Sequence, residues 1–196
     1  IAAARIAQNG NLVDVYTQFC HKIPIFAFAK LFFFFDPRMK IILFSRSQVA
    51  HAAADIERLF DAIGRHSFDY AINREFAEAV ENRFGRAIDP AAVYDGSTGR
   101  QPAESVMVCC GGDGTLLEGI HRLSDKSIPV AGINFGHLGF LTSATREGVD
   151  DLFDDIAYGR LATQPRSLLE VRGVSEAGHA LLALNEVAAQ RLEATM

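Results

Sequence analysis

The chain has 196 residues, of which 49% are hydrophobic and 22% charged, which is ordinary for a globular protein and enough for one large domain or one domain plus part of another. Its formal net charge of −5 argues against nucleic acid or an anionic membrane as the main partner, because both are bound through an excess of Lys and Arg. The three cysteines, Cys20, Cys109 and Cys110, fit neither a disulfide framework nor a zinc-ligand spacing, so we expect a reduced, cytoplasmic protein.

Residues 1–38 differ in character from the rest of the chain. They contain an apolar run from Ile25 to Phe35, interrupted by Lys30, which is too short to span a bilayer and is similar to the apolar part of a signal segment. No small-residue cleavage site follows. Met39 opens the stretch "MKIILFSRSQ", in which a Met and a Lys precede a buried strand, a pattern typical of the start of a protein chain. We therefore expect residues 1–38 to be an upstream extension that is extraneous or poorly ordered, with a membrane anchor as the alternative.

From Met39 onward, strand patterns and helix patterns alternate. Apolar runs predict strands at 40–45, 68–72, 106–110 and 128–134. Apolar residues at helical spacing predict helices from near Ser47 to Gly64, over 74–85, from Thr115 to Leu123, and around 149–156, where Thr145 is placed to cap the start and Gly159 the end. Prolines and glycines make the segment 89–105 a loop.

After Gly159 the alternation stops. Two extended runs joined by "SEAGH" predict a hairpin with no helix between its strands. The expected fold class is therefore α/β: a Rossmann-like domain with a mostly parallel sheet at 39–160, followed at 161–196 by the first strands of a truncated β-rich domain, a β-sandwich.

The sequence "GGDGT", Gly111 to Thr115, lies between a buried strand and a helix, where open α/β sheets bind their ligands. Gly111 and Gly112 allow a sharp turn and a close approach to a ligand, and the amides that open the helix suit phosphate. Asp113 would repel a phosphate, but a carboxylate beside an attacking hydroxyl can accept its proton. We therefore expect the Asp113 carboxylate to act on the attacking hydroxyl. The backbone amides, together with Mg²⁺, would bind the phosphates. A purely structural tight turn is the alternative.

Three segments in this order, "CCGGDGTLLEG", "IPVAGINFGHLGFL" and "LLALNEVAAQR", resemble the NAD kinase family, enzymes that use ATP to phosphorylate the 2′-hydroxyl of the adenosine ribose of NAD. The first segment alone is shared in similar form with diacylglycerol kinases and phosphofructokinases, whereas the order and spacing of all three are highly specific. The resemblance covers Met39 to Met196 and leaves residues 1–38 unexplained.

The resemblance implies roles for individual residues. Asp113 would be the proton acceptor, and Gly114 would contact the dinucleotide beside it. The implied nucleotide-binding residues are Gly112, Asp113, Gly114, Thr115, Phe140, Leu141, Asn185 and Glu186, of which Phe140 and Leu141 would bracket the adenine. An aromatic ring supplies stacking area, Asn both donates and accepts, and Glu accepts from ribose hydroxyls. Phe140 alone fits an ordinary core position equally well. The implied small molecules are ATP as phosphate donor, Mg²⁺ or another divalent metal, and NAD as substrate bound partly by the β-rich domain; we also expect a homo-oligomer when the protein is full length.

Other polar residues are weaker candidates. His121 follows the glycine turn on the same helix and could reach a phosphate, but a surface histidine is the simpler interpretation. The aspartates at 150, 151, 154 and 155 fit the solvated face of an amphipathic helix better than a metal site, so we assign no residue as a metal ligand. His137 is expected to have a structural role in its turn.

Two other functions stay open. A lipid kinase of the diacylglycerol type would share the glycine motif but has no reason to carry "GINFGHLGFL", and a nucleotide-binding module without catalysis has no reason to keep Asp113. The family's second domain carries a Gly-Ser-Thr-Ala-Tyr segment that grips the diphosphate of NAD, and the sequence given ends before it. We therefore expect the 196-residue chain by itself to show no measurable kinase activity, to bind NAD weakly and to aggregate.

Overall fold

The structure, a computed structural model, describes residues 2–8, 11–17, 22–26, 39–46, 52–136, 139–171 and 181–184. Its contacts divide the chain into two compact units. One unit is Ile23–Pro165, and the other joins Ile1–Lys22 to Arg166–Met196. The first unit contains "GGDGT".

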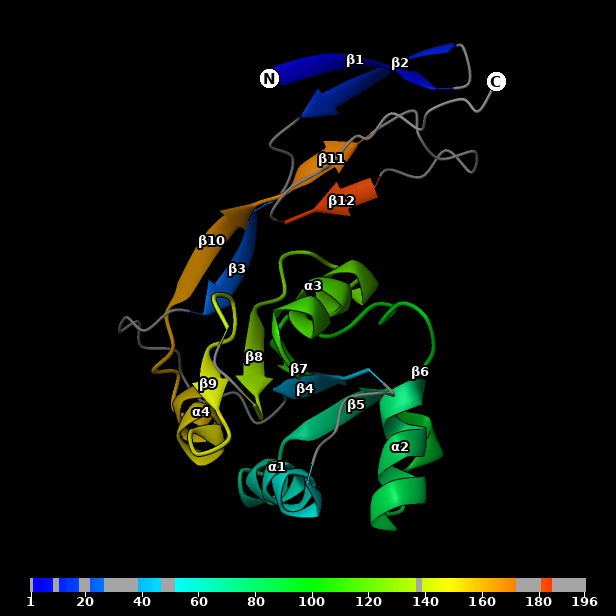
Figure 1. The fold of residues 1–196 in the computed structure, drawn as a ribbon. Helices are drawn as coiled ribbons and strands as arrows, with labels where there is room; N and C mark the ends of the chain where they lie inside the picture. Colours follow the sequence, from blue (N-terminus) through cyan, green and yellow to red (C-terminus); the bar gives the residue numbers. More distant parts are fainter. Residues whose placement is uncertain are drawn as a thin grey trace. The chain divides into compact units, whose positions relative to one another are not determined.

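The described part of the first unit is built on a sheet of eight strands in the order β10-β3-β8-β7-β4-β5-β6, with β9 paired to β8 (Figure 1). The strands are β3 (Lys22–Phe26), β4 (Lys40–Phe44), β5 (Asp69–Asn73), β6 (Val93–Tyr94), β7 (Ser105–Cys110), β8 (Val130–Asn134), β9 (Ala144–Thr145) and β10 (Thr163–Ser167). The pairs β4–β5, β4–β7, β7–β8, β5–β6, β3–β8 and β8–β9 are all parallel. This confirms the predicted α/β class with a mostly parallel sheet.

Helices cover both faces of this sheet. Figure 1 shows α3 (Asp113–Arg122) on one face and α1 (Ala53–Arg65) and α4 (Val149–Ala157) on the other. Side chains alternate along each strand, so Ile41 and Leu43 of β4 join the core cluster that α1, α4 and α2 (Arg74–Phe84) share, whereas Ile42 is buried outside that cluster. Burial raises the pKa of the Cys109 and Cys110 thiols, which favours their neutral, unreactive form.

Several predicted boundaries needed correction. The helix expected from Thr115 begins at Asp113, because Gly112 already takes the extended N-cap conformation. Thr145 does not cap α4, which begins after Gly148; Gly159 does end it, in the left-handed conformation with φ of 60°. The expected loop at 89–105 contains a short 3₁₀ turn (Pro90–Ala92) and β6, elements too short to leave a periodic pattern.

The second unit contains four strands within its described residues. β1 (Ala2–Gln8) pairs antiparallel with β2 (Asn11–Thr17), and β11 (Leu169–Val171) pairs antiparallel with β12 (Leu181–Ala183). The antiparallel β11–β12 pair agrees with the two extended runs of the predicted hairpin, whose connection at 172–180 lies outside the described residues. The division into an extension, an α/β domain and a β-rich domain stays a prediction.

Candidate active site

The turn between β7 and α3 requires glycine at its first position. Gly111 has φ of 152°, and a Cβ there would lie 2.8 Å from the Cβ of Thr115. Its N–H donates to the carbonyl of Ile133 at 2.8 Å, which ties the turn to the neighbouring strand β8. Gly112 then caps α3, and its carbonyl accepts from the Thr115 amide at 2.9 Å. The chain therefore passes from strand to helix through only two residues, Gly111 and Gly112.

Asp113 is the first residue of α3, and its carboxylate crosses to a second glycine-bearing turn. One oxygen, Oδ2, accepts the N–H of Phe140 at 2.9 Å, and the other, Oδ1, accepts the N–H of Leu141 at 3.1 Å. In the first turn of α3 the Thr115 amide donates to Gly112, whereas the amides of Asp113 and Gly114 have no acceptor within the helix and lie beside this carboxylate. The Asp113 carboxylate and the amides of Asp113 and Gly114 thus lie together at the carboxyl edge of the sheet, where parallel α/β folds bind ligands.

The other predicted residues of these two turns differ in exposure. Phe140 is 101% exposed, so it does not occupy a core position, whereas Leu141 is half-buried. Gly114 is exposed on the first turn of α3. Thr115 is only 4% exposed and packs beneath Gly111, so its position supports the turn itself. Asn185, Glu186 and His137 lie outside the described residues.

Three polar residues that the sequence reasoning missed lie at the same edge. Ser45 is fully buried and donates its hydroxyl to the carbonyl of Cys110 at 2.7 Å, directly before the glycine turn. The Asn73 amide bonds both the N–H and the C=O of Ser45 at 3.0 Å. These bonds join the ends of β4, β5 and β7. The signal that could have found both residues is their place at the carboxyl end of a buried strand.

Arg46 is the third missed residue. Its guanidinium donates to the carbonyl of Gly114 at 2.9 Å and to the carboxylate of Glu118 at 2.6 Å. Burial would raise the pKa of Glu118, but the bonds from Arg46 and Arg122 outweigh it and lower that pKa. The single carboxylate of Glu118 is therefore shared between Arg46 and Arg122.

Comparison with known proteins decides the family. The profile of the ATP-NAD kinase N-terminal domain matches residues 39–161. The chain belongs to the NAD kinase family. The NAD kinase of Ralstonia nicotianae is 31% identical over 158 residues, covering 80% of this chain and 50% of that protein. The NAD kinase of Christiangramia forsetii is 25% identical over 162 residues, covering 80% of this chain and 54% of that protein. The chain thus spans about half the length of the curated relatives that it matches.

The fold is shared with a solved structure. The crystal structure of yeast NADH kinase complexed with NADH matches with a TM-score of 0.55 and 16% identity, over 84% of this chain and 54% of that one. At this identity the likeness concerns the fold, and it agrees with the parallel sheet and flanking helices described above.

The weaker candidates of the sequence fall outside this candidate site. His121 lies eight residues beyond Asp113 on α3, which is roughly 12 Å along the helix axis. Burial and then the charge of Lys126 lower its pKa. Asp150 pairs with Arg58 and Arg65 of α1, and Asp154 pairs with His66, the residue that follows α1. Within the described residues no group of three or more His, Cys, Asp or Glu side chains is arranged to hold a metal ion.

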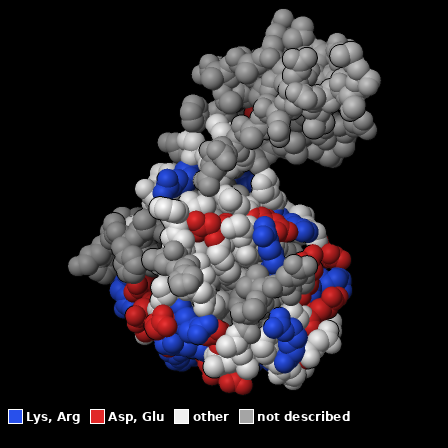
Figure 2. All heavy atoms as spheres, in the orientation of Figure 1, with Lys and Arg blue, Asp and Glu red and all other residues white. Residues whose placement is uncertain are grey.

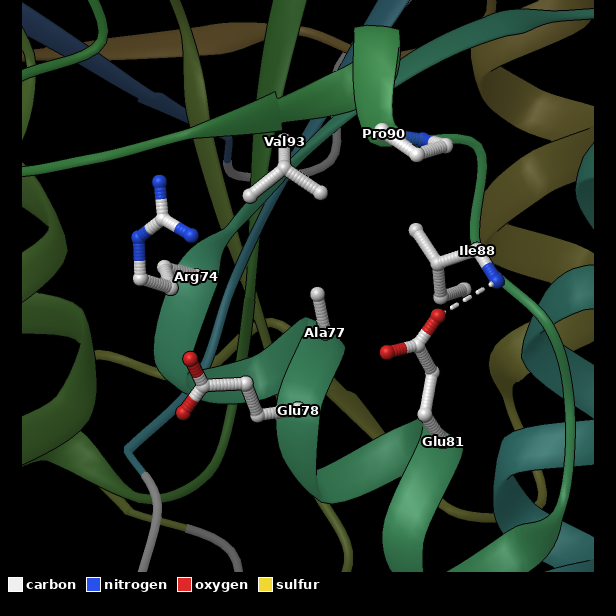
Figure 3. A pocket seen from close by; sticks show the side chains of 7 residues that line it. All are labelled: Arg74, Ala77, Glu78, Glu81, Ile88, Pro90 and Val93. Atoms are coloured by element: carbon white, nitrogen blue, oxygen red, sulfur yellow. Dashed lines mark hydrogen bonds between the residues drawn. The ribbon is translucent and has the colours of Figure 1, made fainter.

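A pocket of about 290 Å³ lies elsewhere in the NAD kinase fold, between α2 and the segment 88–93 (Figure 3). Its lining mixes Arg74, Glu78 and Glu81 with small apolar side chains, and Glu81 accepts the N–H of Ile88 at 3.1 Å. None of the predicted site residues lines it, so we assign it no part in the site.

The described surface shows two further features. Figure 2 shows positive and negative side chains interspersed over the described residues of one face, without a broad region of a single sign. Among the helices of the described residues, none has the length and apolar character needed to cross a bilayer.

Proposed function

We propose that this chain carries the α/β half of an NAD kinase active site, in which Asp113 activates the 2′-hydroxyl of the adenosine ribose of NAD. The observation that carries the proposal is the position of Asp113 at the junction of two glycine-bearing turns, with both carboxylate oxygens held by backbone amides at 2.9 and 3.1 Å. The family match supplies the substrate class.

The proposed reaction is a direct phosphoryl transfer. The carboxylate of Asp113 accepts the proton of the 2′-hydroxyl as that oxygen attacks the γ-phosphorus of ATP, and the bond to the β-γ bridging oxygen breaks to release ADP. The products are NADP and ADP, and the proton passes from Asp113 to solvent. Each carboxylate oxygen has lone pairs left for the hydroxyl after accepting one amide.

The amides of Asp113 and Gly114 at the start of α3 suit the phosphates of the donor, because they are unpaired within the helix and lie at its positive end. Mg²⁺ would enter as the ATP complex, since this ion is commonly held through substrate phosphates rather than by an all-protein cage. We assign Arg46 to support of this turn and not to phosphate binding, because its guanidinium already donates to the carbonyl of Gly114 at 2.9 Å and to Glu118 at 2.6 Å.

Phe140 is proposed to stack on the adenine, with Leu141 beside it. Full exposure of the Phe140 ring next to the candidate base supports this role. We further propose that Asn185 and Glu186 bind the nucleotide, that the protein is cytoplasmic, and that the complete protein is a homo-oligomer; these three points rest on the sequence alone.

The test is product formation by the complete protein that contains this chain. Purified protein is incubated with ATP and Mg²⁺ and with NAD, with NADH, or with diacylglycerol in micelles. NADP formation from NAD is the expected result, and NADH is included because the yeast relative was solved with it. Phosphatidic acid without NADP would favour the lipid kinase, and ATP binding without any product would favour a non-catalytic module.

A further inference from the structure

The segment 139–142 contacts the candidate base through its backbone, while the side chain of Phe140 is exposed to solvent. We propose that residues 139–142 are the positioning element of Asp113: their amides set the orientation of its carboxylate, and glycine at 139 leaves the space that this orientation needs. The inference rests on Asp113 being the base.

The two hydrogen bonds fix the orientation of the carboxylate plane of Asp113. Phe140 and Leu141 donate to different oxygens of Asp113, so rotation of the carboxylate about its own axis would weaken both bonds together. An acid that acts as a base must point one lone pair at the hydroxyl, and an orienting partner is the usual means of achieving this. Here the backbone of residues 139–142 is the orienting partner.

Gly139 adds a steric requirement. A Cβ at position 139 would lie 2.6 Å from Cγ of Asp113 and 2.8 Å from its Oδ2, closer than real Cβ contacts allow. The atoms in the way belong to the Asp113 side chain and not to backbone. The fold can therefore absorb an alanine at 139 by turning the carboxylate away, which is the one movement that would misplace the base.

The segment itself is anchored to β8. Thr142 is only 8% exposed, and its Oγ1 accepts the N–H of Gly139 at 3.0 Å. The next residue, Ser143, donates its N–H to the carbonyl of Gly132 in the middle of β8 at 2.8 Å. The Thr142 hydroxyl thus closes the turn that places Gly139 against Asp113, and its removal should loosen the same arrangement.

The decisive measurement compares turnover and KM in the complete protein for Gly139→Ala and Gly148→Ala. Gly148 is the matched control, because a Cβ there meets nothing closer than 3.7 Å and the residue lies at the start of α4. We expect Gly139→Ala to lower kcat by about 10²-fold with KM for NAD changed by less than about twofold, as for a reacting group displaced by about an ångström. Gly148→Ala should keep kcat even if it loses some thermal stability.

A pair of variants at 142 covers the case in which Gly139→Ala fails to fold. Thr142→Val removes the acceptor for the Gly139 amide and should lower kcat, whereas Thr142→Ser keeps it and should restore most of the loss. Equal kcat in these two variants, or wild-type kcat in Gly139→Ala, would overturn the proposal.

A double variant separates this proposal from the proposed function. If Gly139 acts through Asp113, then Gly139→Ala should cause no additional loss of turnover in a protein that already carries Asp113→Asn. An equal loss in both backgrounds would overturn the positioning role. Wild-type turnover in Asp113→Asn alone would instead refute Asp113 as the base, which is the failure of the proposed function.

Discussion

Phe140 exposes its whole ring to solvent although its own amide is bound by Asp113. Burial of such a side chain is worth roughly 1.5–3 kcal/mol, so a ring left in water on a tethered segment forgoes a stabilising contact. A planar ligand that covers the ring would recover it. The adenine of the dinucleotide is the ligand that the proposed function supplies.

We therefore expect Phe140→Ala to raise KM for NAD by about tenfold, since stacking of a base on an aromatic ring is worth about 1–3 kcal/mol. The unfolding midpoint should not change, because no buried contact is lost. Tyr158→Ala is the control, as Tyr158 is also an exposed aromatic, at 59%, and lies just after α4. An unchanged KM in Phe140→Ala would remove the ring from the binding site.

Among the elements, α3 depends on close packing against the sheet. A Cβ at Gly119 would lie 2.5 Å from Sγ of Cys109 and 3.1 Å from Cδ1 of Phe44, both of which are buried. This glycine lets the helix that presents Asp113 approach β7 and β4 closely. Any larger residue must push α3 outward or shift core side chains.

We expect Gly119→Ala to lower the free energy of unfolding by about 1–3 kcal/mol, as overpacking of a dense core does. Gly64→Ala in α1 is the matched control, because nothing lies within 4 Å of its would-be Cβ. Alanine in that open helical position should stabilise by about 0.5–1 kcal/mol. Chemical unfolding of both variants measures the difference, and equal effects would contradict the packing argument.

The contact between α1 and α4 carries a pH dependence. The hydrogen bond from Arg65, with a further bond from Arg58, holds the pKa of Asp150 below its ordinary value despite some burial. A carboxyl whose pKa is lower in the folded state contributes stability above its unfolded pKa, and this is lost as pH falls through the folded pKa. The Asp150 side chain is 31% exposed, so solvent screens the pair.

Asp150→Asn should therefore lower the free energy of unfolding at pH 7 by about 0.5–1 kcal/mol. The difference from the wild-type protein should shrink as the pH is lowered below about 4, where the unfolded carboxyl is protonated. Asp151→Asn, on an exposed position of the same helix, serves as the control. Thermal unfolding across this pH range gives the test, and a difference that grows toward low pH would contradict it.

At the scale of the molecule, the buried strands β4, β7 and β8 were predictable because continuous apolar runs are typical of strands covered on both faces. Asp113 was predictable for a similar reason, as a carboxylate inside a glycine turn at a strand end. Its contact with Phe140 and Leu141 was not, because it joins residues 27 and 28 positions apart and depends on the parallel register of β7 and β8. Short elements such as β6 and β9 were missed because two residues carry no periodicity.

The most direct test of the account is Asp113→Asn in the complete protein, with NADP formation and NAD binding measured on the same samples. Asparagine keeps the shape of the side chain but cannot act as the base, and its single amide oxygen can accept only one of the two N–H groups of Phe140 and Leu141. We expect turnover to fall by roughly 10²–10⁴-fold, while the Kd for NAD stays within about twofold, because Asp113 would act on a proton and not as the main source of affinity. Near-normal turnover in Asp113→Asn would contradict the account, since no other described group at this edge of the sheet is assigned to take that proton.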